Sequence, residues 1–419
     1  ITDISNCPLL PLSLINNESI TFDIILSDSP SYLIVDWGDD TNDSYYTAST
    51  LITISHVYST SFTGQIRIRS SLGNENISEF KNFIIADVTF NSIAFNTSEL
   101  GAFTGLVKFL CADNVYGAVS NVVTGDIANL PPLLERFICA GNNTTYGLID
   151  SLPSSLTFFE NRGFNTTSGN IANLPSGLTL YRNTGNNTTS GNIALLPSGL
   201  VNYTNTGVNT TSGNISGLPS TLTFYDNRGN NTTTGDIVDL PFDLATYINH
   251  GFNTTYGNIN NLKTALTYYN NIGYNITSGD IDNLKSSLTF YLNWGNNITT
   301  GNIADLKPEL LFYSNDGQNT TYGLLQDLPI NLTHFTNIGN NTVSGNIKLI
   351  PSGIIYFSLQ GQANNLSYIG GRTWAENMQF VFVNPIDGSF DPAEVDDLLI
   401  DLSNVGTWTN FAGVTPKRI

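Results

Sequence analysis

The stretch "NRGFNTTSGNIANLPSGLTLYRNTGNNTTSGNI", from Asn161 to Ile193, decides the fold because it nearly repeats itself after 22 residues. The Asn of each "NTT" or "NIT" triplet, called the anchor below, recurs at that spacing without an insertion: Asn143, Asn165, Asn187, Asn209, Asn231, Asn253, Asn275, Asn297, Asn319 and Asn341. A fixed period of about 20 to 29 residues with spaced leucines is typical of a solenoid, whose units bury their apolar faces by stacking. The repeat predicts that most of the chain is one stack.

Four positions in each repeat hardly vary, and they follow one another at steps of two. They are an aromatic residue six before the anchor, an Asn four before, a Gly two before and the anchor itself. The aromatic residues are Phe159, Tyr181, Tyr203, Tyr225, Tyr247, Tyr269, Tyr291, Tyr313 and Phe335. Alternate residues of a strand share a face, so we expect these side chains to point into the solenoid. Buried Asn side chains need partners, and we expect stacked Asn to bond one another and the adjacent turns as polar ladders.

The second part of each repeat supplies apolar residues that close the core, such as Gly191, Ile193, Leu196 and Leu200. The segment "LTFYDNRGNNTTTGDIVDLP", from Leu222 to Pro241, resembles the plant-type leucine-rich repeat. The resemblance covers residues 109 to 371 and implies a parallel sheet on one face with irregular turns on the other. Two features differ from the family: Asn stands where the family has a strand Leu, and the turn before the Gly is one residue longer.

The three cysteines Cys7, Cys111 and Cys139 are too few and too scattered for a disulfide framework. Cys111 and Cys139 follow Phe109 and Phe137 by two residues, the place that Asn occupies in other repeats. Free Cys is readily buried. We therefore expect both to be buried substitutes for the Asn rather than a disulfide or a reactive thiol.

Residues 1 to 88 lack the repeat and alternate apolar with polar residues, which predicts a separate β-sandwich. The segments "VDWGDDT" (Val35 to Thr41) and "HVYSTSFTGQIRI" (His56 to Ile68) resemble the polycystic-kidney-disease type of immunoglobulin-like domain, although Asp40 replaces the usual Gly. Because the resemblance implies a spacer module, we interpret Asp39, Asp40 and His56 as turn and packing residues rather than a site.

The segment "DPAEVDDLLIDL", from Asp391 to Leu402, predicts a helix with an Asp cap and Pro at its first position. We expect it to cover the last rung, and we expect part of this C-terminal cap to be missing because the sequence ends in a strand-like pattern. The predicted fold class is therefore mainly β: a β-sandwich (1–88), a leucine-rich-repeat solenoid with a parallel sheet (89–371) and a C-terminal cap with a short helix (372–419).

Composition and side-chain spacing argue against several functions. The 15 Lys and Arg against 34 Asp and Glu give a net charge of -19, which disfavours nucleic acid as a partner, and no apolar run is long enough to span a membrane. His56, His250 and His334 are too far apart for a triad. The outward acids Glu160, Asp226 and Asp316 lie three and four repeats apart. At about 4.8 Å per rung, those gaps exceed the roughly 5 to 9.5 Å of a glycosidase pair. We therefore expect no catalytic residues and no cofactor.

One weak candidate for a metal site lies on the turn side of the solenoid. Asp305 and Asp327 occupy the same position in adjacent repeats, below Asn283. Stacked oxygen ligands of this kind could hold calcium. A solvated acidic edge is the commoner outcome, and we favour it.

The outward positions between the constant ones follow no period. On three consecutive repeats they bring together six apolar or aromatic residues and three polar ones, namely Ile248, His250, Phe252, Asn270, Ile272, Tyr274, Leu292, Trp294 and Asn296. Six such residues together suggest an interface. These nine residues form the predicted patch, a ligand-binding surface; contact with a neighbouring domain or a second copy of the chain is the alternative.

These features predict a non-catalytic recognition or adhesion protein that is extracellular, on a cell surface or on a virion. A sandwich module followed by such repeats resembles the surface adhesins of Bacteroidetes and the fibre or decoration proteins of bacteriophages. The resemblance implies a host-surface glycan or protein as partner, together with further copies of the chain or a particle anchor protein. Two alternatives stay open: a structural protein of a surface assembly and, less favoured, an enzyme acting on polysaccharide.

Overall fold

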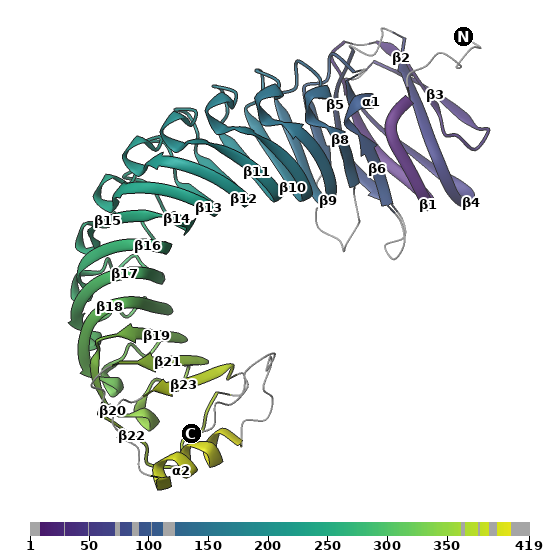
Figure 1. Cartoon of the computed structure of the whole chain (residues 1–419). Coiled ribbons are helices and arrows are strands. Elements are labelled where there is room, and N and C mark those ends of the chain that lie inside the picture. Colours follow the sequence, from purple (N-terminus) through teal and green to yellow (C-terminus); the bar gives the residue numbers. More distant parts are fainter. Residues whose placement is uncertain are drawn as a thin grey trace. The chain divides into compact units, whose positions relative to one another are not determined.

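A computed structural model of the chain describes residues 9–28, 30–48, 50–71, 76–85, 92–101, 103–111, 122–361, 365–375, 378–384 and 392–403 (Figure 1). Strands dominate these residues, and a short α-helix follows them near the C-terminus. The chain divides into two compact units, one of residues 1–212 with 227–230 and the other of residues 213–226 with 231–419.

The first unit begins with antiparallel strands. They are β1 (Leu9–Leu26), β2 (Ser31–Asp36), β3 (Asn42–Thr47), β4 (Leu51–Ser70) and β5 (Ile77–Ile85). Strand β1 pairs with β4 and β5, while β2 pairs with β3 and with the end of β4. Alternate side chains such as Phe22, Val35 and Ile54 are buried between the strands. The predicted β-sandwich is confirmed.

The hydrogen bonding of the sandwich continues into the solenoid. Strand β5 is antiparallel to β1 and parallel to β7 (Lys108–Cys111), and β6 (Ser92–Asn96) is antiparallel to β1 and parallel to β8 (Val122–Asp126). A short helix, α1 (Thr97–Leu100), follows β6. Parallel pairing therefore begins within the predicted sandwich, and the predicted boundary at residue 88 lies outside the described residues.

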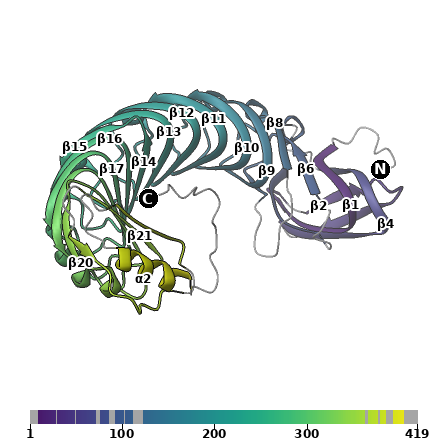
Figure 2. The same cartoon turned by 60° about the horizontal axis from the view of Figure 1, so that its bottom comes forward.

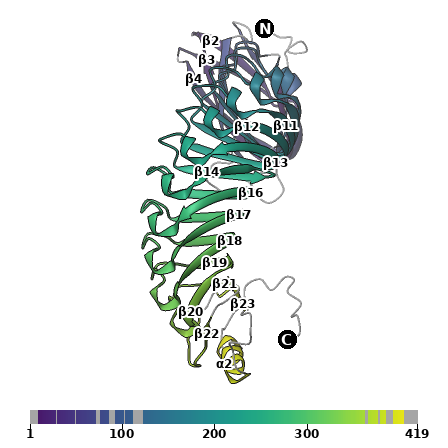
Figure 3. The same ribbon diagram turned by 60° about the vertical axis from the view of Figure 1, so that its left-hand side comes forward.

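Parallel strands then follow one per repeat, some of them interrupted at the middle. They are β9 (Arg136–Leu148), β10 (Phe158–Asn170), β11 (Leu180–Asn192), β12 (Asn202–Asn214), β13 (Phe224–Asp236), β14 (Thr246–Gly251), β15 (Thr254–Asn258), β16 (Tyr268–Asp280), β17 (Phe290–Asn302), β18 (Phe312–Leu324), β19 (His334–Gly339), β20 (Thr342–Asn346), β21 (Tyr356–Gln360), β22 (Leu366–Ser367) and β23 (Phe380–Asn384). Figure 2 shows β10 beside β11, and Figure 3 shows β16 to β19 side by side. The predicted solenoid with a parallel sheet is confirmed, one rung for each 22-residue repeat.

A 3-10 helix ends each turn. These helices are η2 (Ile127–Asn129), η3 (Ile149–Ser151), η4 (Ile171–Asn173), η5 (Ile193–Leu195), η6 (Ile215–Gly217), η7 (Ile237–Asp239), η8 (Ile259–Asn261), η9 (Ile281–Asn283), η10 (Ile303–Asp305), η11 (Leu325–Asp327) and η12 (Ile347–Leu349). Most are capped by an Asn or Asp, as where Asn192 Oδ1 accepts a hydrogen bond of 2.9 Å from the Ala194 amide. Ile193 and Leu200 are fully buried behind this cap, so the short helix places the closing apolar residues in the core.

Each long strand bends at a glycine, and the pairing register changes there. Before the bend Phe159 pairs with Tyr181, 22 residues on; after it Asn165 pairs with Gly185, 20 residues on. Gly185 has a φ of 142°, and a Cβ there would lie 2.7 Å from the carbonyl oxygen of Gly163. Glycine is therefore required at the bend, because only it allows both this backbone conformation and the close approach of the rungs.

The register change decides how the buried Asn are bonded. The anchor Asn297 lies opposite Thr277 of the preceding rung, and its Oδ1 accepts hydrogen bonds from the Thr277 hydroxyl (2.7 Å) and amide (3.2 Å). The same hydroxyl accepts a bond of 2.7 Å from Nδ2 of Asn293. The inward direction of the Asn is confirmed, but the prediction that stacked Asn bond one another is wrong, because the 20-residue register sets Thr opposite the anchor.

The inward aromatic residues stack along the core. Tyr269 and Tyr291 have ring centroids 5.6 Å apart, and the Tyr291 hydroxyl accepts a hydrogen bond of 3.1 Å from Asn293. Burial raises the pKa of Tyr291 well above its ordinary value, so this hydroxyl stays neutral. Cys139 is fully buried as predicted; the side chain of Cys111 lies outside the described residues.

The C-terminal helix α2 (Pro392–Ser403) is confirmed, although its predicted cap Asp391 lies outside the described residues. It contacts the end of the solenoid through carboxylates, since Asp401 Oδ2 accepts hydrogen bonds from the Tyr368 hydroxyl (2.6 Å) and the Arg372 amide (2.9 Å). On the predicted apolar stripe, Leu399 is 57% exposed. The contact therefore combines these hydrogen bonds with the other apolar side chains of the stripe, which are half-buried.

The Thr hydroxyl between rungs can be tested by an isosteric change. We expect Thr277→Val to lower the free energy of unfolding by about 1 to 3 kcal/mol, because Asn293 and Asn297 each lose a buried hydrogen bond. Urea unfolding of the whole chain measures the loss. Thr320→Val is the matched control, because Thr320 is exposed and Ile298 occupies its position one repeat earlier. Equal stability of the two variants would contradict the bonding described above.

Candidate binding surface

The outward face of the sheet in the second unit consists of three columns of side chains. The aromatic column, seven residues before the anchors, contains Tyr268, Phe290, Phe312, His334 and Tyr356. The middle column, five before, contains Ile248, Asn270, Leu292, Ser314, Thr336 and Ser358. The tryptophan column, three before, contains His250, Ile272, Trp294, Asp316, Ile338 and Gln360.

The middle column forms a buried floor between the other two. Its members are between 1% and 8% exposed, including the predicted patch residues Ile248, Asn270 and Leu292. Asn270 is also engaged by the flanking column, since its Oδ1 lies 2.9 Å from Nε2 of His250. These three side chains face outward as expected, yet their neighbours cover them, so they shape the surface more than they offer contact area.

The aromatic column is a stack of half-buried rings that the sequence reasoning missed. Ring centroids are 4.0 Å apart for Tyr268 and Phe290 and 4.1 Å for Phe290 and Phe312, and the stack continues through His334 to Tyr356. Burial lowers the pKa of His334, which favours the neutral ring within the stack. The signal was present in the sequence: these residues directly precede the constant inward aromatic, so strand alternation places them on the outward face.

A depression of about 260 Å³ opens where the floor is made of small residues. It is lined by Trp294, Asp316, Thr336, Ile338, Tyr356, Ser358 and Gln360. Farther back along the floor, Leu292 and Ile248 fill the corresponding space with larger side chains. Trp294 is 39% exposed, and its Nε1 donates a hydrogen bond of 2.7 Å to the Ser314 hydroxyl. The indole is therefore held in one orientation at the edge of the depression.

Asp316 is the charged group of this depression. Burial raises the pKa of its carboxyl, and a hydrogen bond from the Gly317 amide partly opposes that effect. Among the described residues, no Lys, Arg or His forms an ion pair with it. The carboxylate thus lies half-buried beside aromatic rings with its remaining lone pairs open to a ligand.

The other members of the predicted patch lie beyond the glycine bend. Phe252 and Tyr274 are 51% and 57% exposed, with ring centroids 6.1 Å apart, and Asn296 is exposed in the same column. The patch is therefore two neighbouring surfaces. Trp294 and Ile272 belong to the sheet face, and the Phe252 and Tyr274 pair lies past the point where the strand turns.

The sheet face of the first unit has a different chemistry. Glu160 forms ion pairs with Arg162 and Arg182, the latter at 3.2 Å. Arg136 lies over the ring of Phe158, 4.6 Å from its centroid. This surface of ion pairs contrasts with the aromatic strip of the second unit, formed by the aromatic and tryptophan columns, where Asp316 is the one acid among the described residues. Both stand on the same backbone pattern.

The weak metal candidates Asp305 and Asp327 are exposed residues at the ends of η10 and η11. In the described part of the chain, no group of three or more His, Cys, Asp or Glu side chains is placed to hold a metal ion. Burial raises the pKa of the neighbouring Asp282, and the charges of Asp280 and Asp305 add to this shift. The carboxylates of Asp280, Asp282 and Asp305 therefore repel one another on the turn side of the solenoid.

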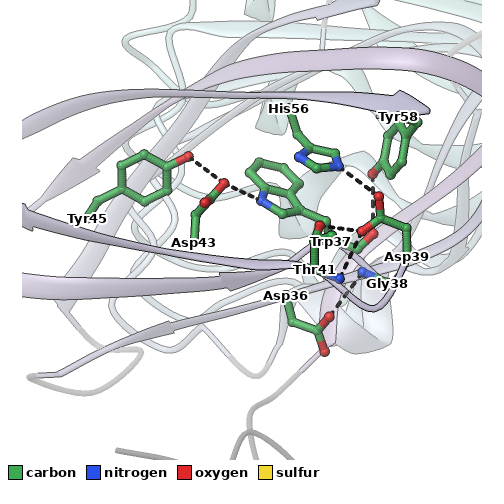
Figure 4. Close-up of polar contacts among 9 residues, drawn as sticks. All are labelled: Asp36, Trp37, Gly38, Asp39, Thr41, Asp43, Tyr45, His56 and Tyr58. Carbon is green, nitrogen blue, oxygen red and sulfur yellow. Dashed lines mark hydrogen bonds and ion pairs between the residues drawn. The ribbon is translucent and has the colours of Figure 1, made fainter.

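In the N-terminal sandwich, the cluster around Asp39 is satisfied within its own turn (Figure 4). Asp39 Oδ2 lies 3.0 Å from Nε2 of His56, and its Oδ1 accepts bonds from the Thr41 amide and hydroxyl. Burial alone would raise the pKa of Asp39, but the bonds from Thr41 and His56 outweigh it and lower that pKa. His56 stacks on Trp37 at 4.6 Å. These contacts agree with a packing role for Asp39 and His56.

The described residues include no helix with the length and apolarity needed to cross a membrane.

No family model matches this chain. No curated protein matches it either. Among solved structures, it is similar to a plant peptide hormone receptor, RGFR1 in complex with RGF2, with 21% sequence identity and a TM-score of 0.45. The similarity covers 64% of this chain and 49% of the receptor chain, so the chain spans about half of that protein's length.

Asp40 allows a test of the turn in the sandwich. Its φ of 68° lies in the left-handed region, which favours Gly. We expect Asp40→Ala to destabilise the β2–β3 hairpin by about 1 kcal/mol and Asp40→Gly to leave it unchanged or more stable, because Gly has no steric penalty there. Amide hydrogen exchange in β2 and β3 measures the difference. Faster exchange in the Gly variant than in the Ala variant would contradict this account.

Proposed function

We propose that this chain is a non-catalytic recognition protein, displayed outside a cell or on a virus particle, that binds a host or partner surface through the outward sheet face of residues 246–360. The observation that carries the proposal is the aromatic strip on that face, formed by the aromatic and tryptophan columns, in which Asp316 is the one carboxylate among the described residues. Exposed aromatic residues gathered in this way contribute most when a partner removes them from water.

The aromatic strip has the composition of a recognition surface. Trp294 is exposed and orientationally fixed, while Tyr268, Phe290 and Tyr356 are half-buried and held by stacking or packing. Side chains already fixed in the free protein lose little conformational entropy on binding. The other residues of the predicted patch have three roles in this surface. The strip is extended by His250, Ile272, Phe252 and Tyr274. It is supported from the floor by Ile248, Asn270 and Leu292, and Asn296 adds a polar group at its border.

A catalytic role has little support on this face. Asp316 is the carboxylate that lines the depression, and the other outward acid of the second unit, Asp226, lies four repeats away along the sheet. Glycoside cleavage requires two carboxyl groups about 5 to 9.5 Å apart. Binding without chemical conversion is therefore the better fit.

The remaining parts of the proposal concern organisation and partners. The β-sandwich of residues 1–88 is a spacer of the polycystic-kidney-disease type, the solenoid of residues 89–371 carries the binding face, and residues 372–419 form the cap. The partner is a glycan or a protein of a host surface, as for adhesins or phage fibres, and further copies or a particle anchor protein hold the chain in place. The net charge of -19 disfavours nucleic acid.

An alternative is a structural protein that packs in a surface assembly. The observation that favours it is the exposed pair Phe252 and Tyr274, which a neighbouring copy could cover. In that case Tyr274→Ala would weaken self-association in sedimentation experiments, whereas Trp294→Ala would not.

We expect the double change Trp294→Ala and Tyr274→Ala to abolish binding to ligands selected from a printed glycan array and a displayed peptide library, because both aromatic contact areas are lost. The melting temperature should hardly change, since exposed side chains contribute little to the core. Tyr322→Ala is the matched control, because Tyr322 is 49% exposed but lies outside the sheet face. Full binding by the double variant would place recognition elsewhere on the molecule.

A further inference from the structure

We infer that the depression beside Trp294 is a binding site for one residue of a neutral sugar chain. The inference deepens the proposed function and rests on it, since it names the ligand class for the same sheet face. It is drawn from the groups that line the depression: two aromatic side chains, a carboxylate, two hydroxyls, an amide and an aliphatic side chain.

The hydrogen-bonding groups of the depression require a ligand that both donates and accepts. Asp316 offers acceptors, Gln360 offers both donors and an acceptor, and the hydroxyls of Thr336 and Ser358 can do either. An ammonium or guanidinium group only donates, so it would pair with Asp316 but could not accept from the Gln360 amide. A carboxylate or phosphate only accepts and would be repelled by Asp316. Each sugar hydroxyl donates and accepts, and it carries no charge.

The half-buried carboxylate suits neighbouring hydroxyl groups in particular. A carboxylate has two oxygen atoms that can each accept from one of two adjacent hydroxyls, and hydrogen bonds to a charged acceptor are stronger than neutral ones. Asp316 has a bond from the Gly317 amide and no ion-pair partner among the described residues. Burial has already removed part of the water around this carboxylate, and the hydroxyl groups of a sugar would replace the water that remains.

The aromatic residues supply the apolar contact that a sugar ring needs. Trp294 and Tyr356 both line the depression, from the tryptophan column and the aromatic column. The ring of a sugar has apolar C–H faces, which pack on flat aromatic surfaces. The bond from Trp294 Nε1 to Ser314 uses the polar edge of the indole within the protein, so the ring contributes apolar surface rather than a donor.

The floor of the sheet limits where the sugar can lie. Thr336 and Ser358 are small and leave the depression open, whereas Leu292 and Ile248 fill the floor on earlier rungs. A sugar ring therefore fits over β18, β19 and β21 beside Trp294, and the rest of the sugar chain would continue over the more apolar part of the strip. The site is shallow, which suits a residue within a longer chain better than an enclosed monosaccharide.

The test uses isothermal titration of the full chain with methyl glycosides of neutral hexoses and with neutral oligosaccharides that a printed array retains. We expect at least one to bind, and Asp316→Asn to weaken that binding by about 10- to 100-fold, as loss of a hydrogen bond to a charged group would. Trp294→Ala should weaken it by at least as much. Asp243→Asn is the charge-matched control, because Asp243 is exposed on the turn side, and it should bind as the unchanged protein does.

Three results would overturn the inference, and they separate it from the proposed function. If no neutral saccharide binds but a displayed peptide binds in a Trp294-dependent way, the sugar site is wrong and the recognition face stands. If a cationic peptide binds and Asp316→Asn abolishes that binding, the carboxylate serves a cation instead. If saccharides bind equally well to Trp294→Ala, Asp316→Asn and the unchanged protein, both the sugar site and the sheet face are wrong as the place of binding.

Discussion

The buried Thr hydroxyl between successive rungs is the interaction on which the solenoid depends. In the example of Thr277, it donates to Asn297 and accepts from Asn293 of the next rung. A hydroxyl is the one small side-chain group that can do both at once. Without it the inward amides would lose partners in a core that water does not reach. The repeated Asn and Thr are thus two halves of one bonding pattern.

That pattern fixes the backbone, and the backbone decides which outward residues meet. The bend at the glycines separates the sheet face from the column of Phe252 and Tyr274. Before the bend, equivalent positions of successive repeats lie opposite each other; after the bend, the changed register sets different positions of the repeat opposite each other. Because the rungs are held from inside, outward side chains can vary without affecting the stack. The ion pairs of the first unit and the aromatic strip of the second stand on the same scaffold.

Low charge on the aromatic strip is notable in a chain with a net charge of -19. The acids collect elsewhere, as on the η helices, where Asp282 and Asp305 repel each other. Such charge keeps copies of the chain apart and discourages nonspecific anionic contacts. A strip with one carboxylate, Asp316, in a chain that is otherwise strongly acidic therefore favours binding on this face, where packing and hydrogen bonds select the partner.

The sequence by itself determined the period, the inward aromatic and Asn residues, the burial of Cys139 and the helix near the C-terminus. These follow from local rules: alternation along a strand, a repeated spacing and a capped amphipathic segment. The Thr partner of the anchor, the outward aromatic column, the burial of Ile248 and Leu292 and the division of the predicted patch were missed. The aromatic column was within reach of strand alternation. The Thr partner and the division of the patch depend on the glycine bend, where close backbone packing sets the offset between rungs at 20 residues instead of the 22 of the period. The burial of Ile248 and Leu292 depends on cover by the flanking columns, which strand alternation does not give.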